Sequence, residues 1–140
     1  MIAQLNNSIV KLLSQLENAI TELTDEQFNL PVPLLGGATI GQHIRHIVEC
    51  YLELLSGYQS GTIKYDERKR DLLLQTCRQT AIGKLREIGT SINLDNKALF
   101  LCSEQSVDEA GAIKLATNYD WELLYNLEHT VHTWRSLGWV

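Results

Sequence analysis

The stretch TIGQHIRHIVECYLELLSGYQSG, residues 39–61, decides the fold of this chain. Thr39 is followed by Gln42 at the spacing of a capping box, which predicts that a helix begins near Ile40 and runs to the glycines of SGYQSG. The stretch also places His43 and His46 three residues apart, on one face of that helix. Apolar side chains recur at steps of three and four residues, as one buried helix face requires, at Ile44, Ile47, Val48, Tyr51, Leu52 and Leu55.

Helical periodicity continues on both sides of this stretch. A first helix is predicted to end near LTDEQ (23–27), and its apolar stripe is formed by Ile2, Leu5, Ile9, Leu12, Leu13, Leu16, Ile20 and Leu23. NLPVPLLGGA (29–38) holds both prolines and a Gly-Gly pair, which predicts an extended loop. A third helix is predicted to open at YDERKRD (65–71) with Asp66 as its N-cap. Its buried side is formed by Leu73, Leu74, Cys77, Ala81, Leu85 and Ile88.

The period changes after the third helix. KALFLCSEQS (97–106) and GAIKLATNY (111–119), separated by VDEA, predict a short β-hairpin. A fourth helix is then predicted to begin at TNYD, with Thr117 as its cap and Asp120 in the fourth place, and to end at Gly138. These elements predict an all-α fold, a four-helix bundle with the hairpin inserted before the last helix.

Length and composition indicate a single domain over residues 1–140. The net charge is −5 and the basic residues are dispersed, which argues against nucleic acid as a partner. No apolar run approaches the roughly 20 residues of a membrane helix, and the N-terminal segment lacks the pattern of a signal peptide. The three cysteines are widely spaced and do not suggest a disulfide framework, which predicts a reduced, cytoplasmic protein.

The histidines are the candidate functional residues. The chain has four, and NLEHTVHTW (126–134) places His129 and His132 at the same spacing as His43 and His46. If the two helix faces meet in the bundle, these imidazoles can converge on one zinc, nickel, copper or ferrous ion. The alternative is a hydrogen-bonded core cluster without metal, since spacing alone is a weak pattern. Cys50 is either a further ligand or, more simply, a small buried side chain.

The segment YDERKRD also has two interpretations. It is either a solvated helix start with local ion pairs, which contribute little to stability, or it places Tyr65 and Arg68 at the rim of a site to meet an anionic substrate. The tryptophans at helical spacing are interpreted as core and dimer-contact residues: Trp121, Trp134 and Trp139.

Three segments together resemble the DinB/YfiT-like superfamily of metal-binding four-helix proteins. They are TIGQHIRHIVECYLELLSGY, YDERKRD and ELLYNLEHTVHTW, in matching order between about residues 36 and 137. The resemblance implies an up-down-down-up bundle, often dimeric, with a divalent metal held by one histidine of the second helix and an HxxxH pair of the last. By position His46 and His129 match two of these ligands.

The second position of the HxxxH pair is Thr133 in this chain, and threonine is a poor ligand for such metals. Three alternatives follow: His132 turns inward to serve, His43 completes the set, or the site has decayed. The resemblance therefore supports two hypotheses. One is a metal-dependent thiol S-transferase, or a hydrolase, that uses a low-molecular-weight thiol. The other is a non-catalytic bundle with structural histidines. Both include a homodimer, because Val10 widens the apolar stripe of the first helix.

Overall fold

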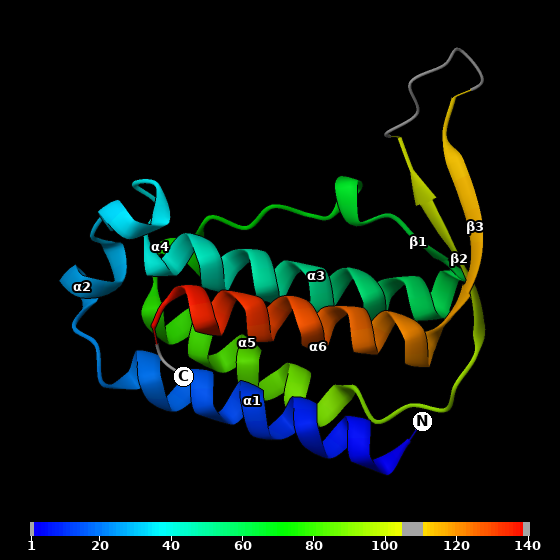
Figure 1. The fold of residues 1–140 in the computed structure, drawn as a ribbon, viewed down its shortest axis with the longest axis horizontal. Coiled ribbons are helices and arrows are strands. Elements are labelled where there is room, and N and C mark those ends of the chain that lie inside the picture. The colour runs from blue at the N-terminus through cyan, green and yellow to red at the C-terminus, as the bar shows by residue number, and fades with distance from the viewer. Residues whose placement is uncertain (1, 105–110, 139–140) are drawn as a thin grey trace.

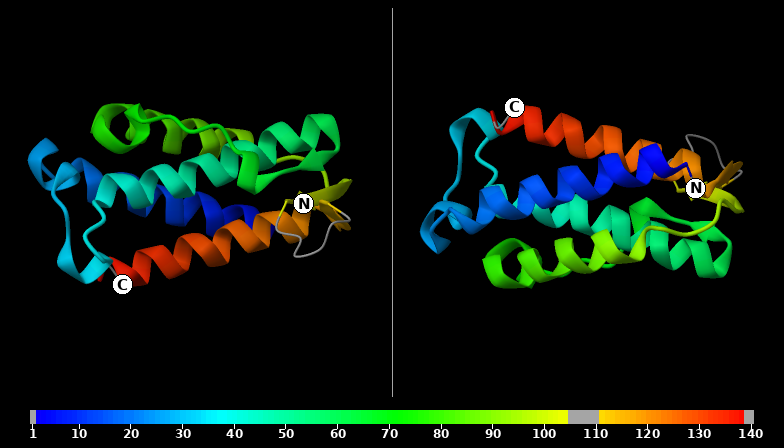
Figure 2. Two further views of the ribbon diagram at one scale, coloured as in Figure 1. Left: turned by 90° about the horizontal axis from the view of Figure 1, so that it is seen from above. Right: turned by 90° about the horizontal axis from the view of Figure 1, so that it is seen from below.

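Four long helices run side by side in the computed structural model, which describes residues 2–104 and 111–138 (Figure 1). They are α1 (Ala3–Thr21), α3 (Ile40–Ser60), α5 (Arg78–Ser91) and α6 (Tyr119–Ser136). α1 and α3 each pack against both α5 and α6, so the four helices surround one core. α1 and α6 run in one direction along the bundle, and α3 and α5 run in the other (Figures 1 and 2).

The predicted hairpin is confirmed, and it belongs to a small sheet at one end of the bundle. β2 (Ala98–Ser103) pairs antiparallel with β3 (Ile113–Asn118). The sequence analysis missed β1 (Thr62–Ile63), which pairs parallel with β2, because two residues are too few to show a period of two. The predicted turn at 107–110 lies outside the described residues. The chain is thus mostly helical, as predicted, with a sheet of β1, β2 and β3 in its described part.

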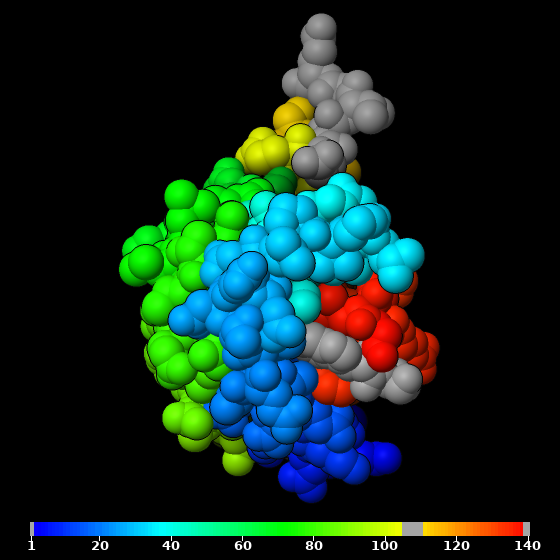
Figure 3. Space-filling model, turned by 90° about the vertical axis from the view of Figure 1, so that its left-hand side faces the viewer, coloured from blue at the N-terminus to red at the C-terminus, as the bar shows by residue number. Residues whose placement is uncertain are grey.

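Short elements lie at the opposite end. α2 (Asp25–Asn29) and the segment that follows it lie across the ends of the long helices (Figure 3). α2 begins at its own capping box, in which Thr24 and Gln27 bond reciprocally. It lies where the first helix was predicted simply to end. The predicted loop that follows is confirmed, with one 3-10 turn, η1 (Pro33–Leu35), inside it.

The start and stop signals of the long helices are mostly confirmed. The Thr39 and Gln42 bonds close the predicted capping box of α3, at 2.8 and 2.9 Å. Thr117 was wrongly predicted to cap α6. The cap is Asn118, whose side chain accepts from the Trp121 backbone N–H at 2.9 Å. α6 ends at Ser136, and Gly138 follows in the left-handed conformation expected of a helix stop.

The predicted third helix does not begin at YDERKRD, and the direction of the helices explains why. α3 and α5 are parallel, so the chain must return along the whole bundle between them (Figure 1). α3 has 21 residues and is therefore about 32 Å long at 1.5 Å per residue. Residues 61–72, here called the strap, reach roughly 40 Å when extended but only about 18 Å as a helix. The strap is accordingly extended, with β1 near its start, and one 3-10 turn, η2 (Tyr65–Glu67), interrupts it.

The strap and the segment after it lie close against α3 at two glycines. A Cβ at Gly57 would come within 2.6 Å of Ile63 Cγ1, and a Cβ at Gly41 would collide with the Gln75 carbonyl. Asp66 does not cap a helix; its carboxylate accepts from the Glu104 backbone N–H at 2.8 Å. The helix itself begins later, as α4 (Leu73–Thr76), and continues as α5 after a break.

Two buried tyrosine hydroxyl groups form hydrogen bonds inside the core. Tyr51 and Thr130 share a hydrogen bond of 3.0 Å, and the Tyr119 hydroxyl donates to the Ile92 carbonyl at 2.6 Å. Trp121, which was predicted to be a core or dimer-contact residue, is 67% exposed and is therefore no part of the core. Trp134 is partly buried, and Trp139 lies outside the described residues. None of the described helices combines the length and the apolar character that crossing a membrane requires.

Candidate functional site

Three of the four histidines, His43, His46 and His129, lie together where α3 packs against α6. The rings of His46 and His129 lie edge to face, with centroids 4.7 Å apart. This confirms the prediction that the second and last long helices bring these two residues together. His43 lies one turn before His46 on α3, and its Nε2 atom is buried. We call His43, His46 and His129 the histidine cluster.

Two buried nitrogen atoms of the histidine cluster lack hydrogen-bond partners. His43 Nε2 and His129 Nε2 are buried and make no hydrogen bond within the described part of the chain. A buried polar atom is normally paired, because leaving it unpaired costs free energy. These two atoms are therefore the places in the cluster where a ligand or a water molecule would be expected.

His46 differs, because a basic side chain of the strap already contacts it. Arg68 Nη2 lies 2.9 Å from His46 Nδ1. A guanidinium group can only donate, so His46 Nδ1 must accept, and the neutral ring then carries its proton on Nε2. A metal-bound histidine usually has the opposite arrangement, in which the outer nitrogen donates to a carboxylate or carbonyl. Arg68 therefore holds His46 in the tautomer that is not ready to bind a metal through Nε2.

The surroundings keep the cluster uncharged. Burial lowers the pKa of His46 to about 4, and the nearby Arg68 charge adds to this effect, followed by His129. Burial is also the main cause that lowers the pKa of His43 and of His129. All three rings are therefore neutral at pH 7, as hydrogen-bonded core histidines and metal ligands both are.

A buried carboxylate holds the strap above the cluster. Glu49, one turn after His46 on α3, is 2% exposed and accepts from the Asp71 backbone N–H at 2.7 Å. Its other oxygen lies 3.5 Å from Arg68 Nε and 3.7 Å from Arg45 Nε. Glu49 thus fixes the guanidinium group that contacts His46.

Other predicted site residues are not part of the cluster. His132 is exposed on α6, so it does not turn inward as one alternative required. Thr133 is the inward-facing residue, 6% exposed, and its hydroxyl donates to the His129 carbonyl at 3.2 Å. Cys50 is buried, and burial is the main cause that raises the pKa of its thiol. It fits the simpler interpretation as a small buried side chain.

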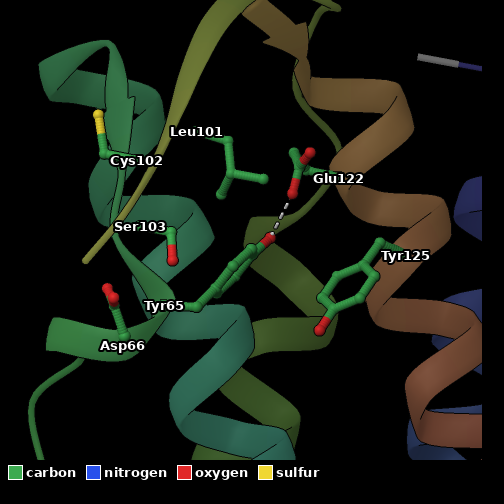
Figure 4. A pocket seen from close by; sticks show the side chains of 7 residues that line it. All are labelled: Tyr65, Asp66, Leu101, Cys102, Ser103, Glu122 and Tyr125. Atoms are coloured by element: carbon green, nitrogen blue, oxygen red, sulfur yellow. Dashed lines mark hydrogen bonds between the residues drawn. The ribbon is translucent and has the colours of Figure 1, made fainter. Parts of the chain in front are cut away.

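Tyr65 lies at a second site, next to the first. Its hydroxyl donates to Glu122 Oε1 at 2.9 Å and accepts from Asn126 Nδ2 at 3.0 Å. Its ring contacts that of Tyr125, at 5.5 Å between centroids, and Tyr125 in turn stacks on His129 at 6.1 Å. Beside Tyr65 is a pocket of about 330 Å³, which we call the tyrosine pocket (Figure 4). It is lined by Tyr65, Asp66, Leu101, Cys102, Ser103, Glu122 and Tyr125.

The cluster offers an incomplete ligand set for the metal that the sequence suggested. His43 and His129 present free nitrogens, but the His46 Nδ1 lone pair is taken by Arg68 and the position of the missing ligand is Thr133. Within residues 2–104 and 111–138, no three histidine, cysteine, aspartate or glutamate side chains gather closely enough to share an ion. The arrangement as it stands does not fit a three-nitrogen metal centre.

In comparisons with known proteins, no family model, no curated protein and no solved structure matches the chain. The geometry therefore carries the functional interpretation.

Sequence reasoning missed two residues of the tyrosine pocket region, Glu122 and Asn126. A signal for them exists, because Glu122, Asn126 and His129 follow one another at steps of four and three, on one face of α6. Polar residues at this spacing on a face that packs into a bundle indicate a buried polar network.

Proposed function

We propose that this chain is a DinB-like bundle protein that binds a small organic molecule in the tyrosine pocket, and that its histidine cluster is a structural relic of a metal site. The direction of the four long helices and the hairpin before α6 support the DinB-like assignment. One observation supports the rest: Arg68 Nη2 lies 2.9 Å from His46 Nδ1, so the ring proton stays on Nε2 and His46 offers no lone pair to a metal ion.

The neighbouring pocket supports the binding function. Its volume of about 330 Å³ lies in the range of small-molecule sites, about 300–1,000 Å³. It combines aromatic and apolar walls with a few fixed polar groups, the composition expected of such a site. The strap, the hairpin and α6 all contribute to it, so it exists only in the folded chain (Figure 4).

Elemental analysis of protein purified without an affinity tag or a chelator tests whether the histidine cluster has lost the ability to bind metal. We expect well below one equivalent of zinc, nickel, copper or iron. One retained equivalent that is lost in His129→Ala, but kept in His132→Ala, would overturn the proposal. The second variant is a matched control, because His132 is on the same helix but exposed.

A gain of metal binding sharpens the same test. Thr133→His restores the missing ligand at an inward-facing position. Arg68→Met frees His46 Nδ1 to carry the ring proton, so that Nε2 can bind the metal. If the site has decayed at these two positions, calorimetric titration with zinc or nickel detects binding in the double variant and not in the parent. Binding of equal affinity in the parent would contradict the proposal.

A metal-dependent enzyme is the second candidate, and the unpaired Nε2 atoms of His43 and His129 favour it. These two atoms would hold the ion. His46 would coordinate it only after Arg68 moves away and the His46 ring changes its tautomer. The reaction class suggested by the resemblance is thiol S-transfer with a low-molecular-weight thiol, with Tyr65 and Arg68 at the substrate. The metal-content measurement above separates the two candidates.

We propose further that the protein forms a homodimer. Ile2, Trp121 and Leu124 are large apolar side chains that are 62%, 67% and 45% exposed, and all three line one shallow groove between α1 and α6. Val10, on which the sequence-based prediction rested, is 39% exposed. A second copy would remove this surface from water. Light scattering at high micromolar concentration should give twice the mass of the chain, and Trp121→Ser should shift the equilibrium toward monomer.

A further inference from the structure

The tyrosine pocket contains a carboxylate, that of Glu122, without a cationic partner among the described residues. The Glu122 side chain is 7% exposed, at the start of α6. One carboxylate oxygen accepts from the Tyr65 hydroxyl at 2.9 Å, and the other accepts from Thr117 Oγ1 at 2.7 Å. Both donors are neutral. No lysine, arginine or histidine of the described residues forms an ion pair with Glu122.

A second carboxylate lies on the other side of the pocket. Figure 4 shows the Tyr65 ring in the middle, with Glu122 of α6 on one side and Asp66 of the strap on the other. The described lining contains no basic residue. A buried carboxylate without a cationic partner is costly, so a ligand that supplies the positive charge would relieve that cost.

Lys64, next to Tyr65 in the strap, pairs with Glu67 at 3.6 Å. Arg68, three residues after Tyr65, also has other partners. Its guanidinium group donates to the Tyr65 carbonyl at 3.0 Å, contacts His46 Nδ1 at 2.9 Å and pairs with Glu49 at 3.5 Å. These three contacts point the group toward the histidine cluster. Arg68 thus balances the charge of Glu49 and leaves that of Glu122.

The aromatic walls favour the same kind of ligand. A cation binds over the face of a tyrosine ring when it lies within about 6 Å of the centroid. The rings of Tyr65 and Tyr125 are 5.5 Å apart and tilted by 41°, so they form a bent wall and not a flat stack. Burial raises the pKa of Tyr65, and the charge of Glu122 adds to this, so its hydroxyl keeps its proton and continues to donate to Glu122.

We propose that the tyrosine pocket binds a small alkylated ammonium ion, with the charge over the Tyr65 ring and between Glu122 and Asp66. Each Glu122 oxygen already accepts a hydrogen bond, so the carboxylate acts mainly through its charge. This favours a cation with methyl groups on nitrogen over one that must donate N–H bonds. The inference rests on the proposed function, because it names the ligand class of that pocket.

The test compares choline with 3,3-dimethylbutan-1-ol, which has the same shape but carries carbon in place of the charged nitrogen. Both are titrated into the parent protein and followed by amide NMR signals of residues 101–103 and 122–125. We expect choline to bind at least tenfold more tightly than the alcohol, and its affinity to fall as salt is added. Equal affinity of the two probes would overturn the ligand class while leaving small-molecule binding intact.

Variants locate the charge that choline recognises. Glu122→Gln should weaken choline binding at least tenfold and leave the alcohol unchanged. Glu128→Gln is the matched control, since it removes the same charge from an exposed position of α6 and should change neither probe. If Glu122→Gln fails to fold, Asp66→Asn, at an exposed residue of the lining, should still weaken choline about threefold. Choline binding that is insensitive to both carboxylates would overturn the inference.

Failure of the inference and failure of the proposed function give different results. A panel of neutral and anionic fragments is measured by the same NMR signals. If neither choline nor any fragment moves the signals of the pocket, both the ligand class and the binding function are wrong. If only a neutral or anionic fragment moves them, the pocket binds small molecules but the cation assignment is wrong.

Discussion

The histidine cluster and the tyrosine pocket lie side by side under the same strap, but they treat charge in opposite ways. At the cluster the buried carboxylate of Glu49 is paired with two guanidinium groups, Arg45 and Arg68. At the pocket the partners of the buried Glu122 carboxylate among the described residues are the hydroxyl groups of Tyr65 and Thr117. The difference teaches that the protein itself neutralises the buried carboxylate of the first site, whereas we propose that a ligand neutralises that of the second. The first should therefore govern stability and the second binding.

The largest effect is expected from Glu49→Ala. The substitution leaves Arg45 and Arg68 without their carboxylate, although their side chains are only 19% and 11% exposed. Breaking such a buried ion pair costs roughly 3–5 kcal/mol of unfolding free energy. Glu53→Ala is the control, because Glu53 also accepts a strap N–H, that of Lys64, but at an exposed hydrogen bond. Urea denaturation should show about 1 kcal/mol or less for the control. Equal losses would remove the distinction between the two carboxylates.

Gly57→Ala tests whether the pocket depends on the close approach of the strap to α3. The new Cβ would lie 2.6 Å from Ile63 Cγ1 and 2.8 Å from the Thr62 carbonyl, just before Tyr65. Such overpacking costs about 1–3 kcal/mol. Gly83→Ala is the control, because nothing lies within 4 Å of its Cβ, and it should stabilise α5 by roughly 0.5–1 kcal/mol. Thermal unfolding shows whether each variant is more or less stable than the parent protein. An increase in stability at both glycines would show that the strap can move to accommodate the new side chain.

Tyr65→Phe sharpens the comparison at the pocket. The variant keeps the ring but removes the hydroxyl that joins Glu122 and Asn126. Losing this bond to a carboxylate should cost about 1.5–3 kcal/mol, below the roughly 3–5 kcal/mol expected at Glu49. Tyr58→Phe loses an exposed bond, to the Asp95 carbonyl, and should cost less. A loss at Tyr65 as large as that of Glu49→Ala, measured by the same denaturation, would contradict the division between stability and binding.

The smallest effect concerns pH and belongs to the cluster. The pKa of His46 is about 4 in the folded protein, whereas an unfolded histidine titrates near ~6.5. The unfolded state therefore binds more protons in this window, and stability falls as the pH falls from ~6.5 toward 4. The effect is modest because His46 is only partly buried. His46→Gln should reduce the loss of stability between pH 7 and pH 5, and His132→Gln, at an exposed ring, should not. The same dependence in both variants would show that other groups cause it.

Local signals were sufficient for much of the fold. The Thr39 capping box, the alternation before and after the hairpin turn, and the spacing of His46 and His129 all depend on residues a few positions apart in the chain. Side-chain periodicity and helix capping depend on neighbours within that range, so they can be predicted without knowledge of the tertiary packing. The predicted cap of α6, Thr117, was wrong by one residue, because the local signals place the start of a helix closely.

The sites themselves were decided by the tertiary structure. Whether YDERKRD becomes a helix or a strap depends on α3 and α5 being parallel, which no residue of that segment encodes locally. Arg68 and His46 are 22 residues apart, and Tyr65 and Glu122 are 57 apart. The sequence therefore determined which helices carry histidines. Only packing decided that the histidine cluster receives a cation from the strap and that Glu122 receives none from the part of the chain that the structure describes, because charges interact through space and not along the chain.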